Sequence, residues 1–243
     1  MSNTPIYVVG DIHGQIDQLY EALDLITAEG GPEAEIVFLG DLVDRGPDSR
    51  AVIRLLLDGL AAGRRWHVLK GNHDQMFARF MASGETRNTR VRSGVDWLHP
   101  RVGGSTTLAS YGLDDIARMR PAAVHAAARQ AVPAEHVAFV DGLTPYHLRD
   151  DVLFVHAGIA PGVALADQSE EDLLWIREPF LSFAEPHPWL VVHGHTALQM
   201  PHHFGNRIDL DGGAGHGRTL YPAVLEGRDC WLLTRGGRVQ LVP

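Results

Sequence analysis

The strongest constraint on this chain is a pattern that occurs three times within its first 80 residues. A short apolar run, rich in β-branched residues, is followed by a glycine, either directly or after one intervening residue. A polar residue then follows that glycine. The runs are residues 6–9, 36–39 and 66–69. Short runs that end abruptly at glycine are typical of buried strands. We therefore expect three short strands in the first third of the chain.

Between these runs the apolar residues follow the period of a helix. They fall at i, i+3, i+4, i+7 and i+10 in residues 16–26, and at i, i+3, i+4 and i+8 in residues 52–60. Pro47, followed by Asp48 and Ser49, is a suitable helix start. Alternation of strands and helices at this spacing predicts a parallel sheet with right-handed crossovers.

Three polar residues mark the ends of the expected strands. Asp11, Asp41 and Asn72 are separated by 30 and 31 residues, about the length of one strand–helix–strand unit. Each would lie at the carboxyl end of its strand, which is the edge where open α/β sheets bind ligands. We expect the three side chains to converge within a few ångströms.

The chain changes character in residues 85–141. An alanine-rich segment, 121–134, predicts a helix, and we expect a mostly helical insertion packed beside the first half of the core. The arginines of the insertion are interpreted as a solvated face, of which one or two could steer an anionic substrate. They include Arg87, Arg90, Arg92 and Arg101.

The last part of the chain returns to short apolar runs with few helical patterns between them. These runs predict the strands of a second, mixed or antiparallel sheet. They are residues 152–155, 189–192, 207–210, 221–225 and 230–234. Because no repeat, linker or charged tail marks a boundary, residues 1–243 are expected to form one domain.

Five glycine-containing motifs carry the polar residues at the expected strand ends. They are Gly10-Asp-Ile-His-Gly14, Gly40-Asp-Leu-Val-Asp-Arg-Gly46, Gly71-Asn-His-Asp74, Val155-His-Ala-Gly158 and His193-Gly-His-Thr196. Carboxylate and amide oxygens together with imidazole nitrogens suit Mn²⁺, Fe or Zn²⁺ better than Ca²⁺. Two such ions bridged by one carboxylate would attract a phosphate dianion.

Composition excludes several other classes of protein. The chain has 14 histidines but one cysteine, Cys230, which excludes a disulfide framework and any cysteine-cluster metal site. The net charge of −9 argues against nucleic acid as a partner. No basic segment precedes the first apolar run, and no run approaches the roughly 20 apolar residues of a membrane helix. We expect a cytoplasmic protein without a membrane partner, and the sequence leaves its oligomeric state open.

In order and spacing, the five motifs resemble those of the calcineurin-like metallophosphoesterases. More narrowly, they look like the phosphoprotein phosphatase family with its bacterial and phage members. The resemblance covers nearly the whole chain and is weakest in residues 85–141. It implies an α/β (α+β) fold of four layers, with two mixed sheets packed face to face and helices outside. It also implies an enzyme, a metal-dependent phosphatase.

The resemblance further implies a set of metal ligands. Asp11 and His13 would hold one ion, Asn72, His156 and His195 would hold the second, and Asp41 would bridge the two. The implied cofactors are two divalent ions, Mn²⁺ first, with Fe or Zn²⁺ as alternatives.

Four further residues receive catalytic roles from the same resemblance. His73 would protonate the leaving group, and Asp44 would orient His73. Arg45 and Arg177 would hold the phosphate oxygens. A histidine is a suitable proton donor near neutral pH, and the guanidinium fork of arginine matches a phosphate bidentately.

The expected reaction is hydrolysis of phosphoserine or phosphothreonine in proteins by direct in-line attack of a hydroxide that bridges the metals. One alternative keeps the chemistry and changes the substrate to a small phosphoester: a bis(5'-nucleosyl)-tetraphosphatase, which hydrolyses diadenosine tetraphosphate. A third reading is a phosphate- or metal-binding module without turnover. Asp44 favours the protein phosphatases, because the dinucleotide hydrolases commonly have a neutral residue there. His73 and Asp44 together argue against the module, since binding alone needs neither.

The chain departs from the family pattern near two of the motifs. The segment Asp211-Gly-Gly-Ala214 lacks the threonine hydroxyl that the family carries there. Ala197 stands where many relatives outside the phosphatase branch have a second metal-binding histidine, so water would fill that position. His193 shares a strand face with His195 and is interpreted as a buried, hydrogen-bonded neighbour of the site rather than as a ligand.

Overall fold

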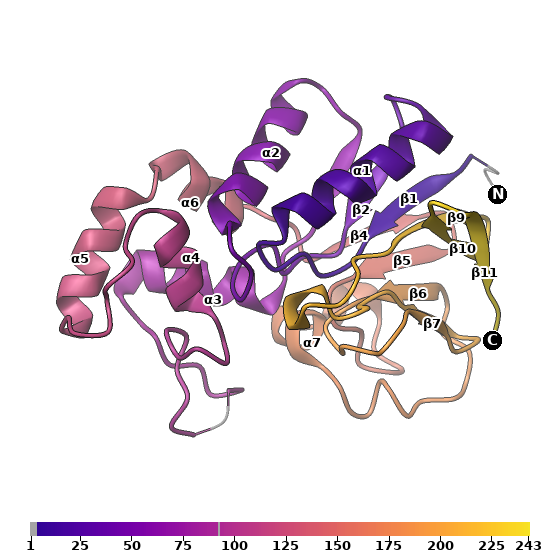
Figure 1. Cartoon of the computed structure of the whole chain (residues 1–243). Coiled ribbons are helices and arrows are strands. Elements are labelled where there is room, and N and C mark those ends of the chain that lie inside the picture. Colours follow the sequence, from indigo (N-terminus) through magenta and orange to yellow (C-terminus); the bar gives the residue numbers. More distant parts are fainter. Residues whose placement is uncertain (1–3, 92) are drawn as a thin grey trace.

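The computed structural model describes residues 4–91 and 93–243, in which two β-sheets pack face to face with helices outside (Figure 1). From edge to edge, the six-stranded sheet contains β11 (Gly237–Leu241), β10 (Asp229–Thr234), β9 (Pro222–Glu226), β1 (Ile6–Val9), β2 (Ile36–Phe38) and β3 (Trp66–Val68). The five-stranded sheet contains β4 (Tyr146–Arg149), β5 (Val152–Val155), β6 (Leu190–His193), β8 (Arg207–Asp209) and β7 (His202–His203). Both sheets mix parallel and antiparallel pairs, which confirms the predicted fold class.

Alternation of side chains along the strands builds the layers. In β1, Ile6 and Val8 pack in the cluster between the two sheets, which also contains Phe154 of β5. Tyr7 and Val9, on the opposite face of β1, pack in the cluster beneath the helices. Successive residues of a strand point to opposite faces, so each short apolar run supplies both cores.

Three helices cover the outer face of the six-stranded sheet. They are α1 (Ile16–Gly30), α2 (Ser49–Ala61) and α3 (Asn72–Ser83). The predicted start of α2 is confirmed, because the Asp48 side chain accepts a hydrogen bond of 2.8 Å from the backbone N–H of Ala51. β1 pairs in parallel with β2, and β2 with β3, as the spacing predicted.

The outer face of the five-stranded sheet has a thinner cover. Helix α7 (Glu170–Trp175) and the segment after it place Leu173, Ile176 and Phe180 against this sheet. Two 3₁₀ turns, Leu165–Asp167 and Ala214–His216, lie in the loops of this half of the chain. None of the helices in the described part of the chain has the length and hydrophobicity that a membrane crossing requires.

The insertion contains α4 (Gly104–Ser110), α5 (Pro121–Ala131) and α6 (Ala134–Asp141), which lie beside α3 at the end of the molecule far from both termini (Figure 1). The helix predicted over 121–134 is present as α5, but it ends at Ala131. The chain turns at Pro133, which has no N–H to donate and starts a new helix instead. Val124 and Val140 belong to the same core cluster as Phe77 of α3.

The prediction for the strands after the insertion is partly wrong. Strands β9 and β10 do not join the second sheet; β9 pairs antiparallel with β1, and β10 extends that sheet with β11. The second sheet is completed instead by β4 and β7, which the sequence analysis did not predict.

Candidate active site

Polar side chains gather where the central strands of both sheets end. Asp11 follows β1, Asp41 follows β2, and Asn72 begins α3 directly after β3. From the second sheet, His156 follows β5 and His195 follows β6. The convergence predicted from the 30- and 31-residue spacing is observed. The six residues expected as ligands are all buried: Asp11, His13, Asp41, Asn72, His156 and His195.

Asp41 lies at the centre of this group. Its Oδ2 is 3.4 Å from His13 Nε2, and its Oδ1 is 3.5 Å from His156 Nε2. Asp41 is shared by two sets of possible metal ligands, one with His13 and His73 and one with Asp11 and His156. A carboxylate placed between two ligand sets is the arrangement that a bridging ligand requires.

The orientation of the imidazoles leaves the nitrogens that face the centre without protons. His13 Nδ1 donates to the carbonyl of Val43 at 2.8 Å, and His156 Nδ1 donates to the carbonyl of Leu39 at 2.9 Å. Such hydrogen bonds fix the tautomer in which Nε2 carries the lone pair, as in metal-binding histidines.

Asn72 provides the observation that most directly indicates a binding site for a cation. Its Oδ1 is 2.9 Å from His156 Nε2 and 2.8 Å from His195 Nδ1. Since His156 Nε2 has no proton to donate, two acceptors face one another at hydrogen-bond distance. A positive ion bound by both atoms removes this repulsion. His195 Nε2, moreover, is buried without a hydrogen-bond partner among the described residues.

Burial shifts the pKa values of the expected ligands in directions that also indicate a cation site. Burial, followed by the negative charges of Asp211 and Asp41, raises the pKa of Asp11 well above its ordinary value. Burial also lowers the pKa values of His13, His156 and His195, which are therefore neutral and available as ligands. A divalent cation would neutralise crowded carboxylates and accept neutral imidazoles, so the residues present fit such an ion.

The backbone is strained where these side chains are placed. Among the described residues, six other than glycine have a positive φ, and five of them are in this site. The five are His13 (49°), Asp41 (51°), Asp44 (74°), Arg45 (67°) and His195 (66°). Conformations of this kind cost about 1–3 kcal/mol each and cluster at functional sites.

Two motif glycines are required by close approach. A Cβ on Gly71 would lie 2.2 Å from Asp41 Oδ1, and one on Gly194 would lie 2.1 Å from Asp11 Oδ1. Any side chain at either position would displace a carboxylate, which explains why glycine flanks the polar residues in these motifs.

His73 and Asp44 form a pair beside the expected ligands. His73 Nδ1 donates to Asp44 Oδ2 over 2.6 Å. Asp44 is fully buried and accepts two more hydrogen bonds from the insertion, from Trp97 Nε1 at 2.9 Å and from Thr107 Oγ1 at 2.7 Å. Trp97 and Thr107 were not among the expected site residues, because nothing in their local sequence pattern indicates a polar contact with a residue more than 50 positions away.

The Arg45 guanidinium lies between the rings of His13 and His73. Its Nη1 donates to His13 Nε2 at 2.7 Å and its Nη2 donates to His73 Nε2 at 2.9 Å. Arg177, after α7, reaches the same place from the other sheet, where its Nη2 lies 3.4 Å from the carbonyl oxygen of His195. The structure thus brings together all ten residues expected in the site.

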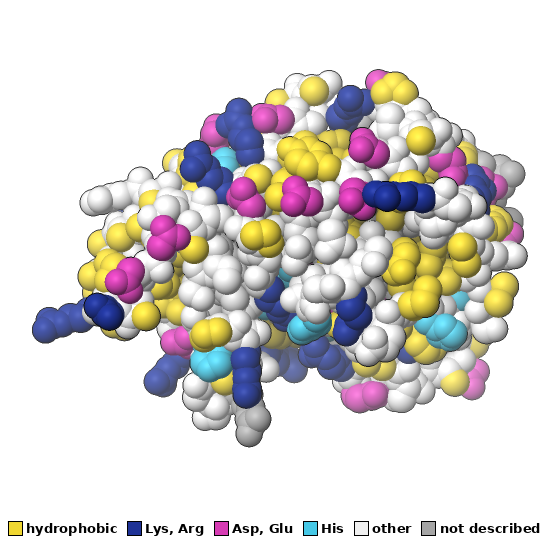
Figure 2. All heavy atoms as spheres, in the orientation of Figure 1, with side chains coloured by type: hydrophobic (Ala, Val, Ile, Leu, Met, Phe, Trp, Pro, Cys, Tyr) yellow, Lys and Arg dark blue, Asp and Glu magenta, His cyan; other side chains and the backbone are white. Residues whose placement is uncertain are grey.

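These side chains open into a cavity of about 180 Å³. The insertion supplies part of its wall through Val91, Arg101 and Val102, and Met76 and Trp175 supply further apolar surface. Figure 2 shows arginine or lysine and histidine side chains gathered in the hollow between the insertion and the sandwich, near the centre of the view. Of the arginines named above for the insertion, Arg101 lines the cavity; Arg90 pairs with Glu171, and Arg92 lies outside the described residues.

Asp74 contributes to the site without lining the cavity. Asp74 accepts hydrogen bonds from the N–H groups of Leu42 and Gly71, which ties the loops after β2 and β3 together. Burial and the charge of Asp41 raise the pKa of Asp74 to about 7. The motif Gly71–Asp74 contained this residue, but the sequence analysis gave it no role.

His193 faces away from the expected ligands. Its Nδ1 donates to the carbonyl of Gly194 at 2.9 Å, and its Nε2 lies 3.1 Å from Arg207 Nη1. This agrees with its interpretation as a buried, hydrogen-bonded residue.

Comparison with known proteins agrees with this geometry. Residues 4–216 match the family model described as "Calcineurin-like phosphoesterase". One curated relative is the asymmetrical bis(5'-nucleosyl)-tetraphosphatase PrpE of Halalkalibacterium halodurans, which is 26% identical over 227 residues, 88% of this chain and 87% of that protein.

Solved structures show the same fold. A putative diadenosine tetraphosphatase superposes with a TM-score of 0.66 at 22% identity, covering 99% of this chain and 95% of that one. A cold-active protein-tyrosine phosphatase from a Shewanella species superposes with a TM-score of 0.64 at 19% identity, covering 98% of this chain and 80% of the other.

Proposed function

The chain belongs to the calcineurin-like phosphoesterases and is a metal-dependent phosphoric ester hydrolase. From that premise we propose that it hydrolyses dinucleoside polyphosphates such as diadenosine tetraphosphate. The curated relative that matches along most of both chains is named for this activity. The comparisons therefore favour the dinucleotide hydrolase over the protein phosphatase that Asp44 had favoured. A single side chain at one position is weaker evidence than similarity along 88% of the chain.

The observation that carries this proposal is the number of guanidinium groups on one cavity. Arg45 and Arg177 suffice to hold the oxygens of a single phosphoryl group. Arg101, on the insertion side of the same cavity, adds a third positive charge. A chain of phosphates carries several negative charges in a row and would engage all three, whereas a single phosphoserine would engage two. The apolar surface of Met76 and Trp175 is suited to a nucleoside.

We propose the metal ligands implied by the family resemblance. Asp11, His13 and Asp41 would hold one divalent ion, and Asp41, Asn72, His156 and His195 the other. When bound, such ions supply a water of lowered pKa and polarise phosphoryl oxygens. Carboxylate, amide and imidazole donors suit Mn²⁺, with Fe or Zn²⁺ as alternatives.

The other residues act on the substrate itself. Arg45 and Arg177 would orient the phosphoryl group under attack; the guanidinium of Arg45, which donates to His13 and His73 in this structure, would turn to the phosphate when a metal ion takes the lone pair of His13 Nε2. With Arg45 turned to the phosphate, His73 would hold a proton at Nε2 for the leaving oxygen, and Asp44 would stabilise the charged imidazole through Nδ1. We also propose that the insertion belongs to the same domain, because it supplies both the hydrogen bonds to Asp44 and one wall of the cavity.

A direct comparison of substrates tests the function. We expect purified protein with Mn²⁺ to hydrolyse diadenosine tetraphosphate with a higher kcat/KM than either a phosphothreonine peptide or p-nitrophenyl phosphate. The products would be resolved by ion-exchange chromatography. Preference for the phosphopeptide would contradict the proposal, and failure to turn over any substrate with Mn²⁺, Fe or Zn²⁺ would favour the binding module.

The role of Arg101 gives a sharper prediction. Arg101→Gln should lower kcat/KM for diadenosine tetraphosphate about tenfold, the loss of about 1.4 kcal/mol from one charged contact. Hydrolysis of p-nitrophenyl phosphate, which has one phosphoryl group, should change less than about twofold. Arg118→Gln is the matched control, since Arg118 is an exposed arginine of the insertion that does not line this cavity. Equal losses on both substrates would contradict a role in binding the phosphate chain.

A further inference from the structure

A second group of metal-binding side chains lies outside the active site. Glu35 immediately precedes β2, His67 lies in β3 and His147 lies in β4, and one donor atom from each is within 4.8 Å of the others. We propose that these three residues bind a divalent transition-metal ion at the edge of the sandwich. The inference does not depend on the proposed function. Glu35 is at the amino end of β2, whereas the active site is at the carboxyl ends of these strands.

The strand alternation makes the histidines unusual. Trp66 and Val68, on either side of His67, pack in the cluster beneath the helices, so His67 faces the layer between the sheets. His147 is paired in register with Phe154, which belongs to the core of that layer. Both positions would ordinarily carry apolar side chains, and both carry imidazoles that meet each other.

The group joins the edges of two different sheets. β3 is the last strand of the six-stranded sheet and β4 is the first strand of the five-stranded sheet. In the described part of the chain, the backbone hydrogen bonding between these edges consists of a bridge between Leu69 and Thr144 and of the N–H of Lys70, which donates to the carbonyl of Thr144. An ion held by His67 and His147 would connect the two sheets where few hydrogen bonds do.

The donor atoms lie close together, and a rotation of one ring out of the stack would direct both imidazole nitrogens at one ion. Glu35 Oε1 is 3.1 Å from His67 Nε2, and the rings of His67 and His147 stack with centroids 3.9 Å apart. Two ligands of a tetrahedral ion at about 2.0–2.1 Å lie about 3.3 Å from each other. His147 Nε2 is buried and has no hydrogen-bond partner among the described residues.

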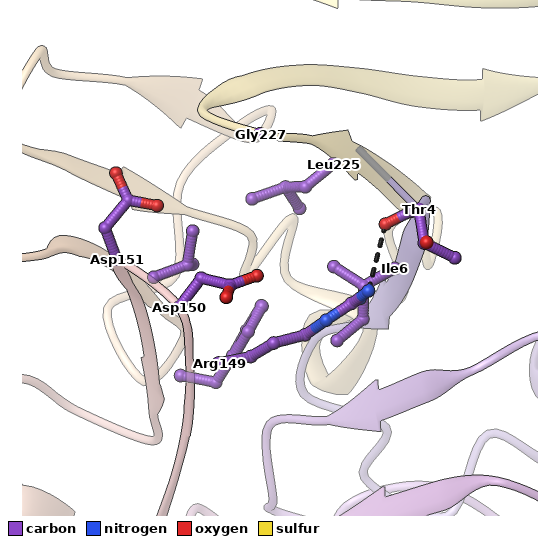
Figure 3. A pocket seen from close by; sticks show the side chains of 9 residues that line it. Thr4, Ile6, Arg149, Asp150, Asp151, Leu225 and Gly227 are labelled. Atoms are coloured by element: carbon purple, nitrogen blue, oxygen red, sulfur yellow. Dashed lines mark hydrogen bonds between the residues drawn. The ribbon is translucent and has the colours of Figure 1, made fainter. Parts of the chain in front are cut away.

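Two arginines fix the orientation of the Glu35 carboxylate. Arg65 Nη2 binds Glu35 Oε2 at 2.6 Å, and Arg149 Nη1 is 3.7 Å from the same oxygen, which leaves Oε1 directed at the histidines. Arg149 is held in turn by the carbonyl of Thr4 (Figure 3).

The donor set defines the class of ion. Two imidazoles and one carboxylate, without a thiolate, are typical of Zn²⁺ sites that keep one position for water, and they also accept Co²⁺ or Ni²⁺. The alternative is a hydrogen-bonded Glu35–His67 pair with His147 merely stacked against it. The two readings differ in whether metal is retained.

Metal analysis distinguishes them. Wild-type protein and the variants His67→Gln and His147→Gln would be incubated with a small excess of Zn²⁺, passed through gel filtration and analysed for zinc. We expect each variant to retain one zinc ion fewer per chain, with hydrolytic activity within about twofold of wild type. His202→Gln, which removes an exposed histidine of β7, should leave the zinc content unchanged. Equal zinc in wild type and both variants would overturn the proposal.

A measurement on the wild-type protein avoids any dependence on the folding of the variants. Zn²⁺ should protect the partly exposed His67 from acylation by diethyl pyrocarbonate, which mass spectrometry would detect. The Zn²⁺ concentration should be one at which His202 still reacts. Zinc should also raise the melting temperature by about 5 °C, in the range expected for a ligand that binds only the folded state. Unchanged reactivity of His67 with and without Zn²⁺ would likewise overturn the proposal.

Discussion

An Asp41→Asn variant should lose about a thousandfold or more in kcat/KM and retain less metal than the wild-type protein. Asp41 is the one carboxylate that both sets of ligands in the site share. Asparagine keeps the size of the side chain and tolerates the positive φ of 51°. It removes the negative charge, however, and interactions with catalytic metals are worth several kcal/mol. Each 1.36 kcal/mol corresponds to a tenfold change in rate.

The same substitution at Asp150 provides the control. Asp150 is an exposed aspartate with φ of 53°, close to that of Asp41. Asp150→Asn therefore removes the same negative charge from the same backbone conformation, but outside the site. Activity and metal content, measured by steady-state kinetics and elemental analysis, should not change in this variant. If Asp41→Asn kept both its metals and its rate, the assignment of Asp41 as the bridging ligand would be wrong.

Spacing was sufficient to place the centre of the site. Asp11, Asp41 and Asn72 follow three strands in a parallel arrangement, and adjacent parallel strands end at one edge. The sequence could not indicate that β9 returns to pair with β1, because an apolar alternation records which faces are buried and not which strand is the neighbour. That pairing positions the 3₁₀ turn Ala214–His216, where a Cβ on Gly215 would lie 2.4 Å from the His13 ring.

The insertion was the part that the sequence described least well. Trp97 and Thr107 hold Asp44 through contacts that no local period records. Arg101 resembles its neighbouring arginines in sequence and differs from them only in lining the cavity. The break between α5 and α6 could have been predicted, since Pro133 lacks the N–H that a continuous helix requires. If Arg101 binds the phosphate chain as proposed, the residue that distinguishes the two substrates lies in this region and outside the five motifs.

A His73→Asn variant should slow the hydrolysis of an alkyl phosphate, such as glycerol 2-phosphate, by about 10²–10³-fold, within the usual contribution of a general acid. The loss with p-nitrophenyl phosphate should be less than about tenfold. Proton donation matters most when the leaving oxygen is strongly basic, as an alkoxide is, and least for p-nitrophenolate. Diadenosine tetraphosphate releases a nucleotide, which is also weakly basic, so its rate should fall with that of the aryl ester. Steady-state kcat values on the three substrates measure this dependence.

A second role for His73 makes the comparison necessary. His73 Nε2 also accepts a hydrogen bond of 2.9 Å from Arg45 Nη2, so removing the imidazole could misplace the guanidinium that holds the phosphoryl group. Every substrate carries that phosphoryl group, and a loss of this origin would be similar for all leaving groups. Arg45→Gln should produce such a uniform loss. If His73→Asn reproduced the uniform pattern of Arg45→Gln, then His73 would position Arg45 and another group would supply the proton. A loss that grows with the basicity of the leaving oxygen, in His73→Asn alone, identifies His73 as the proton donor.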